Sequence, residues 1–132
     1  MKVIRDVVHG YIELSEDDLK IIDTRHFQRL KSIRQNNPFS VYPCANHTRF
    51  EHSLGVMHLG VKVFESLNEK RIHNGDPPFG KELEATVRYA CLLHDVGHAP
   101  FSHYGEQFFN RDDLLPLFSS ALEKRNVDAD LT

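Results

Sequence analysis

The sequence predicts an all-α domain that begins with a small β-hairpin. Three observations support this fold class. Apolar residues recur at helical spacing in several segments, helix-cap signals precede those segments, and two short apolar runs near the N-terminus flank a His-Gly pair. Because 132 residues suffice for one core but not comfortably for two, we expect residues 1–132 to form a single domain.

The N-terminal elements begin with the hairpin. Residues 3–5 and 11–14 flank His9-Gly10, which predicts two short strands with glycine in the turn. Ser15 is expected to cap a first helix, since the acidic residues that follow it match the positive end of the helix dipole.

Two further helix starts follow. A second helix is expected to begin at residues 23–24 and to end at the Asn-Asn-Pro break of residues 36–38, with an apolar stripe formed by Phe27, Leu30 and Ile33. A longer helix is expected after Thr48, because Thr48 and Glu51 have capping-box spacing. Glu51 is therefore expected to be a helix-cap residue and not a catalytic acid.

The longer helix carries two apolar stripes. One stripe consists of Phe50, Leu54, Met57, Val61 and Phe64. The other consists of Val56, Leu59, Val63 and Leu67. A helix that is apolar on two sides is expected to be central to the core, and His52, one turn before the second stripe, is expected to point inward.

The next helix is expected from Lys81 to about Gly97, with Leu83, Val87, Ala90 and His94 on one stripe. Residues 90–93 are all apolar, which predicts burial on every side of the helix there. Pro100 prevents the helix from resuming at once, and a last helix is expected over residues 112–125.

Composition and charge limit the classes of protein. No apolar run approaches the ~20 residues that a membrane span requires, no secretory signal is visible, and Cys44 and Cys91 form no disulfide framework, so a cytoplasmic protein is expected. The net charge of −3 argues against nucleic-acid binding. Residues 24–50 nevertheless contain no acid and five basic residues, which indicates either a site for a compact anion such as a polyphosphate or a solvated basic helix face.

Histidine is unusually frequent, with nine in the chain, and five of the nine lie in two short segments. Asp95 comes after the apolar residues 90–93 with only His94 between them, so its carboxylate must be paired, solvated or coordinated. With His94 beside it and His52 on another helix, the set suits a divalent metal. A core histidine with an Asp–Arg pair is the alternative. A zinc-protease motif at His94 and His98 is disfavoured, because Gly97 and Pro100 break the helix that it needs.

Four sequence blocks carry a resemblance to a known family. They are VIRDVVHGYIEL (3–14), IIDTRHFQRL (21–30), HTRFEHSLGV (47–56) and LHDVGHAPFSH (93–103). On these blocks the chain resembles the HD superfamily of metal-dependent phosphohydrolases, and within it the deoxynucleoside triphosphate triphosphohydrolases, from Lys2 to about Phe108. The resemblance implies a helical HD domain.

The resemblance also implies roles for individual residues. His52, His94 and Asp95 are expected to bind the catalytic metal. The expected substrate and catalytic residues are Arg49 at the phosphates, Gln35 at the deoxyribose, and His98 and His103 beside the scissile phosphate. The expected ion is Fe, Mn, Zn, Co or Ni, with Mg²⁺ accompanying the substrate.

The activity that the resemblance implies is hydrolysis of a deoxynucleoside triphosphate to deoxynucleoside and triphosphate. Another HD-type nucleotide phosphohydrolase or phosphodiesterase, and a non-catalytic nucleotide-sensing module, are the alternatives. A regulatory nucleotide is a further implied partner, at positions matched by Lys2, Val3, Asp23 and Gln28. Relatives in this family form homo-oligomers, so a homo-oligomer is expected.

The family's last metal ligand is an aspartate far downstream of the HD pair, beyond the position of Thr132. We therefore hypothesise that residues 1–132 are the N-terminal part of a longer HD phosphohydrolase. On that hypothesis, activity of these residues alone is an open question, because catalysis depends steeply on how the substrate is positioned.

Overall fold

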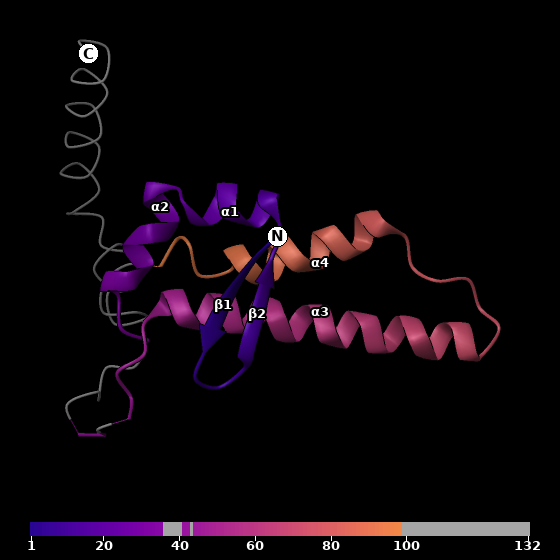
Figure 1. Cartoon of the computed structure of the whole chain (residues 1–132), viewed down its shortest axis with the longest axis horizontal. Coiled ribbons are helices and arrows are strands. Elements are labelled where there is room, and N and C mark those ends of the chain that lie inside the picture. Colours follow the sequence, from indigo (N-terminus) through magenta and orange to yellow (C-terminus); the bar gives the residue numbers. More distant parts are fainter. Residues whose placement is uncertain (36–40, 43, 99–132) are drawn as a thin grey trace, which may run out of the picture. The chain divides into compact units, whose positions relative to one another are not determined.

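The computed structural model describes residues 1–35, 41–42 and 44–98 (Figure 1). The fold is mostly helical and begins with an antiparallel hairpin, as the sequence predicts. The expected helix at residues 112–125 and the candidate residue His103 lie outside the described residues. In the described part of the chain, no helix has the length and apolar character needed to cross a membrane.

The hairpin consists of β1 (Lys2–Asp6) and β2 (Gly10–Leu14), paired so that Ile4 faces Ile12. Gly10 has φ +78°, a conformation that glycine adopts without steric cost. One carboxylate oxygen of Asp6 accepts hydrogen bonds from the backbone N–H groups of Val8 and His9, both at 2.8 Å, which closes the turn. The predicted hairpin is confirmed.

Helix α1 (Glu16–Ile22) starts at the predicted cap. The Ser15 hydroxyl accepts a hydrogen bond from the Asp18 N–H, and the Asp18 carboxylate accepts one from the Ser15 N–H. Asp18 is fully buried and also meets Arg88 of α4 (Lys81–Leu93), whose guanidinium makes a two-nitrogen contact with the carboxylate. Arg88 donates a further hydrogen bond to the Glu13 carbonyl at 3.0 Å. This network ties α4 to β2 and α1.

The second predicted helix is shorter than expected. Thr24 caps α2 (Arg25–Gln28), after which the chain tightens into the 3₁₀ helix η1 (Arg29–Ser32) and becomes extended at Ile33, before the expected break at residues 36–38. The expected stripe of Phe27, Leu30 and Ile33 is nevertheless buried. Its members are three residues apart, and a 3₁₀ helix keeps such residues on one side, so the tighter winding preserves the stripe.

The longest helix, α3 (Arg49–His73), lies alongside α4 (Figure 1). At Gly60 the two helices approach closely, because a Cβ added there would lie 2.6 Å from the Cys91 Sγ. The predicted capping box of Thr48 and Glu51 is present. Glu51 therefore acts as a helix cap, as expected.

Only one of the two apolar stripes of α3 is buried. Leu54, Met57 and Phe64 of the first stripe are buried. In the second stripe the exposed fractions are 48% for Leu59, 59% for Val63 and 48% for Leu67, so the prediction of a helix buried on two sides is wrong for these residues. The physical reason is that β2, η1 and α4, the elements that contact α3 most among the described ones, leave this stripe uncovered.

The prediction for α4 also needs correction. The helix ends at Leu93, before the expected Gly97, and Leu83 and Ala90 are exposed, whereas Leu92 is fully buried. The expected burial on every side at residues 90–93 is therefore wrong. Because Arg88 reaches the buried Asp18, α4 presents the Arg88 and Leu92 side of the helix to the core.

The Asp18–Arg88 pair yields a test of stability. Arg88→Met leaves a buried carboxylate without its charge partner and is expected to lower the free energy of unfolding by about 3 kcal/mol. Urea denaturation measures the loss. The matched control is Lys20→Met, which removes the exposed Lys20–Asp17 ion pair and is expected to change stability far less than Arg88→Met does. Equal losses in the two variants would contradict the assignment.

The same pair predicts a pH dependence. Burial by itself raises the pKa of Asp18, but the hydrogen bonds from Arg88 and Ser15 outweigh it, and the net pKa lies below its usual value. The stabilisation is therefore complete above the ordinary aspartate pKa of about 3.9 and is lost as the pH falls through the lowered value. Asp18→Asn is expected to be less stable at neutral pH and to show a shallower loss of stability in acid.

Candidate metal centre

Three side chains from two helices converge in the described part of the chain. His52 lies in the first turns of α3, His94 is the C-cap of α4, and Asp95 is the next residue. The Nε2 atoms of the two histidines lie 3.3 Å apart. Asp95 places one carboxylate oxygen 3.5 Å from the His94 Nε2 and the other 3.8 Å from the His52 Nε2. Each residue thus offers a ligand atom, and these atoms all lie within 4.8 Å of one another.

The orientation of His94 is set by its own helix. Its Nδ1 lies 2.8 Å from the Cys91 carbonyl, one turn earlier. Because a carbonyl oxygen can only accept a hydrogen bond, Nδ1 must carry the proton. In the neutral ring the lone pair is then on Nε2, the atom that faces His52 and Asp95. A backbone carbonyl that fixes the tautomer in this way is a common feature of metal-binding histidines.

Asp95 is buried, and it is compensated from several directions. The Arg49 guanidinium contacts its Oδ2 at 2.6 Å, and the His98 Nε2 lies 3.4 Å from its Oδ1. Arg49 is buried as well. The Asp–Arg pair that the sequence left as an alternative therefore exists, together with the histidine cluster. The other carboxylate oxygen of Asp95, Oδ1, still faces the rings of His94 and His98.

The donor set fits a divalent transition metal. Ligand atoms around an ion at about 2.1 Å in tetrahedral geometry are roughly 3.4 Å apart. The Nε2 atoms of His52 and His94, 3.3 Å apart, have close to that spacing, and so do the Asp95 Oδ1 and the His94 Nε2, at 3.5 Å. One ligand atom from each of the three residues can be chosen so that all lie within 4.8 Å of one another. Two imidazoles and a carboxylate suit Fe, Mn, Zn, Co or Ni better than Mg²⁺ or Ca²⁺, which prefer oxygen. The helix ends at Leu93, and this helps the adjacent His94 and Asp95 to face one point.

The protonation of His52 favours the same role. Burial lowers the pKa of His52 below its usual value, Asp95 opposes this, and the neighbouring His94 and Arg49 lower the pKa further. The net direction keeps the imidazole neutral. A neutral ring is the form that binds a metal.

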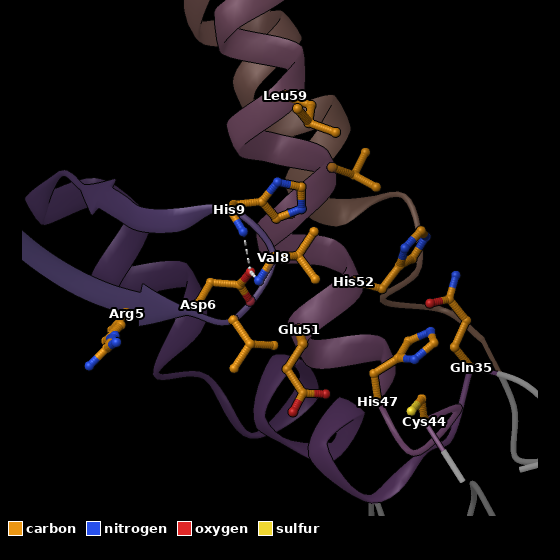
Figure 2. Close-up of a pocket in the computed structure, with 13 residues that line it drawn as sticks. Arg5, Asp6, Val8, His9, Gln35, Cys44, His47, Glu51, His52 and Leu59 are labelled. Atoms are coloured by element: carbon orange, nitrogen blue, oxygen red, sulfur yellow. Dashed lines mark hydrogen bonds between the residues drawn. The ribbon is translucent and has the colours of Figure 1, made fainter. Parts of the chain in front are cut away.

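A cleft of about 500 Å³ lies next to the cluster, between the hairpin turn and the first half of α3 (Figure 2). His52 lines it, and so does Gln35, the residue expected at the sugar. The other lining residues include Arg5, His9, His47, Val56 and Leu59. The structure thus brings two of the predicted site residues to one cleft.

Sequence reasoning missed His9, whose ring lies in this cleft (Figure 2). A Cβ on Gly55 would lie 2.6 Å from the His9 Nε2, so the glycine allows the ring to pack against α3. The His9 and His58 rings are 5.6 Å apart. The His-Gly turn was the only signal in the sequence, and it indicated a turn and not a site.

The positions expected at a regulatory nucleotide are dispersed over the N-terminal elements. Lys2 and Val3 lie on β1, Asp23 is the C-cap of α1, and Gln28 ends α2. The Gln28 side chain donates to the Ile22 carbonyl at 2.8 Å and accepts from Lys31 at 2.7 Å. This second site stays a prediction.

The basic stretch of residues 24–50 is largely engaged in contacts within the chain. Lys31 lies over the Phe50 ring, and Arg34 bonds the Asn46 side chain at 3.1 Å. Arg29 bonds the Val96 carbonyl, and Arg49 bonds Asp95. A broad anion-binding face is therefore disfavoured, and Arg49 is the cation of this stretch that contacts the candidate centre.

Comparison with known proteins agrees with this geometry. The HD domain family model matches residues 49–123. An uncharacterised protein of Methanocaldococcus jannaschii is 46% identical over 121 residues, which are 86% of this chain and 24% of that protein. The human deoxynucleoside triphosphate triphosphohydrolase SAMHD1 is 45% identical over 104 residues, 78% of this chain and 16% of the enzyme. The Dictyostelium discoideum homologue of that enzyme is 40% identical over 111 residues, 83% of this chain and 21% of the homologue.

The chain thus spans about a quarter or less of the length of these relatives. The family match begins at the first residue of α3 and includes both histidines and the aspartate of the cluster. The sequence, the helical fold and the matched residues lead to one assignment: the chain belongs to the HD domain family, and within that family it is similar to the SAMHD1 relatives.

Proposed function

We propose that this chain provides the metal-binding part of an enzyme that hydrolyses deoxynucleoside triphosphates to deoxynucleoside and triphosphate. The observation that carries the proposal is the convergence of His52, His94 and Asp95 beside a cleft. The substrate class is supported by the relatives, among them enzymes named deoxynucleoside triphosphate triphosphohydrolases. A homo-oligomer stays a prediction.

In this proposal the three residues hold a divalent ion. When bound, the ion lowers the pKa of a water molecule and polarises a phosphoryl oxygen. The His52 and His94 rings would contribute nitrogen lone pairs, and the Asp95 carboxylate would contribute negative charge. Asp95 keeps its orientation through Arg49, which bonds it at 2.6 Å.

Arg49 and His98 lie next to this centre. The Arg49 guanidinium places a positive charge beside the cluster, where it would offset charge that develops on the phosphates. The His98 Nε2, 3.4 Å from Asp95, places a titratable group beside the same point, and we assign it the protonation of the leaving oxygen. His103 keeps its expected role next to the scissile phosphate.

Gln35 is assigned to the sugar. Its backbone N–H bonds the His47 carbonyl at 3.3 Å, which holds the residue at the wall of the cleft that His52 also lines. An amide side chain there can both donate to and accept from a deoxyribose hydroxyl.

Activity is the first test. The chain is incubated with each deoxynucleoside triphosphate and Mn²⁺ or Mg²⁺, and the products are separated by chromatography. Deoxynucleoside and triphosphate are expected. Monophosphate with pyrophosphate would refute the proposed cleavage and favour another HD phosphohydrolase. Binding without turnover would favour the nucleotide-sensing module.

Metal retention is the second test. His94→Ala and Asp95→Ala are each expected to weaken Mn²⁺ binding by tenfold or more in calorimetry, because each removes a direct ligand. His73→Ala, an exposed histidine at the end of α3, is the control and is expected to bind as the parent does. Full metal stoichiometry and unchanged affinity in both site variants would mean that the ion lies elsewhere.

The Arg49–Asp95 pair supplies a third test. Arg49→Met removes the cation from a buried carboxylate and is expected to lower the free energy of unfolding by about 3 kcal/mol. Saturating Mn²⁺ is expected to restore part of this loss, since an ion bound only to the folded state stabilises it. Thermal melts with and without Mn²⁺ measure both effects. Arg25→Met, which removes an exposed arginine, is the control, and an Arg49→Met loss as small as that of the control would contradict the pairing.

A further inference from the structure

Arg29 makes a long-range contact to the segment that carries the candidate ligands. Its Nη2 donates a hydrogen bond of 2.6 Å to the carbonyl of Val96, the residue that follows Asp95. The two residues are 67 positions apart in the sequence. The guanidinium touches neither His52, His94 nor Asp95 in any contact that the structure describes.

The acceptor lies in a short non-helical segment. Helix α4 ends at Leu93, and two tight turns follow it, in which the Val96 N–H bonds the Leu93 carbonyl and the His98 N–H bonds the Asp95 carbonyl, both at 3.0 Å. These turns bring His98 back toward Asp95. Both hydrogen bonds are local, so they shape the segment but do not fix it to the rest of the fold.

Arg29, the donor of this hydrogen bond, lies next to buried core residues. Arg29 starts η1 between Phe27 and Leu30, both of which are fully buried in the core. A hydrogen bond from this residue therefore connects the core to the turns. A guanidinium at a helix C-terminus is also electrostatically favourable, because the last carbonyls carry partial negative charge.

We propose that Arg29 is a positioning residue for the metal centre. By holding the peptide after Asp95, it keeps the Asp95 carboxylate facing His52 and His94 and keeps the His98 ring beside Asp95. The expected effect on metal binding rests on the proposed function. The expected effect of the Arg29–Val96 hydrogen bond on amide exchange does not, because it is measured in the metal-free protein. The contact with Val96 also accounts for Arg29, one of the five basic residues of the acid-free stretch at residues 24–50, without a bound anion.

The experiment compares Arg29→Met with Arg25→Met, which removes the same charge from the exposed start of α2. Calorimetry with Mn²⁺ gives the affinity, and amide hydrogen exchange reports on residues 94–98. Arg29→Met is expected to weaken Mn²⁺ binding by about tenfold to a hundredfold, the range found for outer partners of metal ligands. It is also expected to speed exchange at Val96 and His98, whereas Arg25→Met changes neither. Arg29→Lys keeps the charge and a donor and is expected to recover part of the affinity.

Each outcome decides the inference. Faster exchange with unchanged Mn²⁺ affinity would show a merely structural contact and would overturn it, as would no change in either measurement. If the parent chain binds no Mn²⁺, the proposed metal centre fails. The histidine side-chain NMR signals of the metal-free protein then decide, since Arg29→Met must shift those of His94 and His98 and Arg25→Met must not. If Arg29→Met does not fold, Arg29→Gln replaces it in the same measurements.

Discussion

The burial of Asp95 is the constraint on which the arrangement of the site depends. An ionised carboxylate in the interior is costly unless charges and hydrogen bonds compensate it. Arg49 supplies that compensation from the first residue of α3, and His52 approaches from the same helix. The start of α3 and the end of α4 must therefore meet at Asp95. The same convergence creates the pocket of donors that a divalent ion would fill.

A second buried carboxylate fixes the middle of α4, at Arg88. Asp18 completes the capping box of α1 with Ser15, and it binds Arg88, which also reaches the Glu13 carbonyl of β2. The two carboxylates are paired with arginines from distant parts of the chain, and each pairing joins two or more elements. Together they hold α4 in register. The network at Asp18 thereby supports the geometry at Asp95, although it contributes no residue to the centre.

The positions of the two glycines on α3 show how closely the neighbouring elements approach this helix. Gly55 leaves room for the His9 ring from the hairpin turn, and Gly60 leaves room for Cys91 from α4. Both contacts lie on α3 downstream of His52, so the hairpin and α4 are both packed against the helix that carries this histidine. A side chain at either glycine would displace a wall of the cleft or the helix that ends at His94.

The resemblance to the HD superfamily pointed to the three candidate ligands. The sequence by itself determined the hairpin, the Ser15 and Thr48 caps, and the buried stripe of Phe27, Leu30 and Ile33. These features depend on local spacing and cap chemistry, which a sequence displays directly. Which side of α3 and α4 is buried was decided only in the tertiary structure, where Arg88 must reach Asp18 and where the second α3 stripe stays exposed. The contact of Arg29 with Val96 could also be seen only in the tertiary structure. The two residues are 67 positions apart, and every residue has a backbone carbonyl, so the sequence does not show which carbonyl accepts the hydrogen bond.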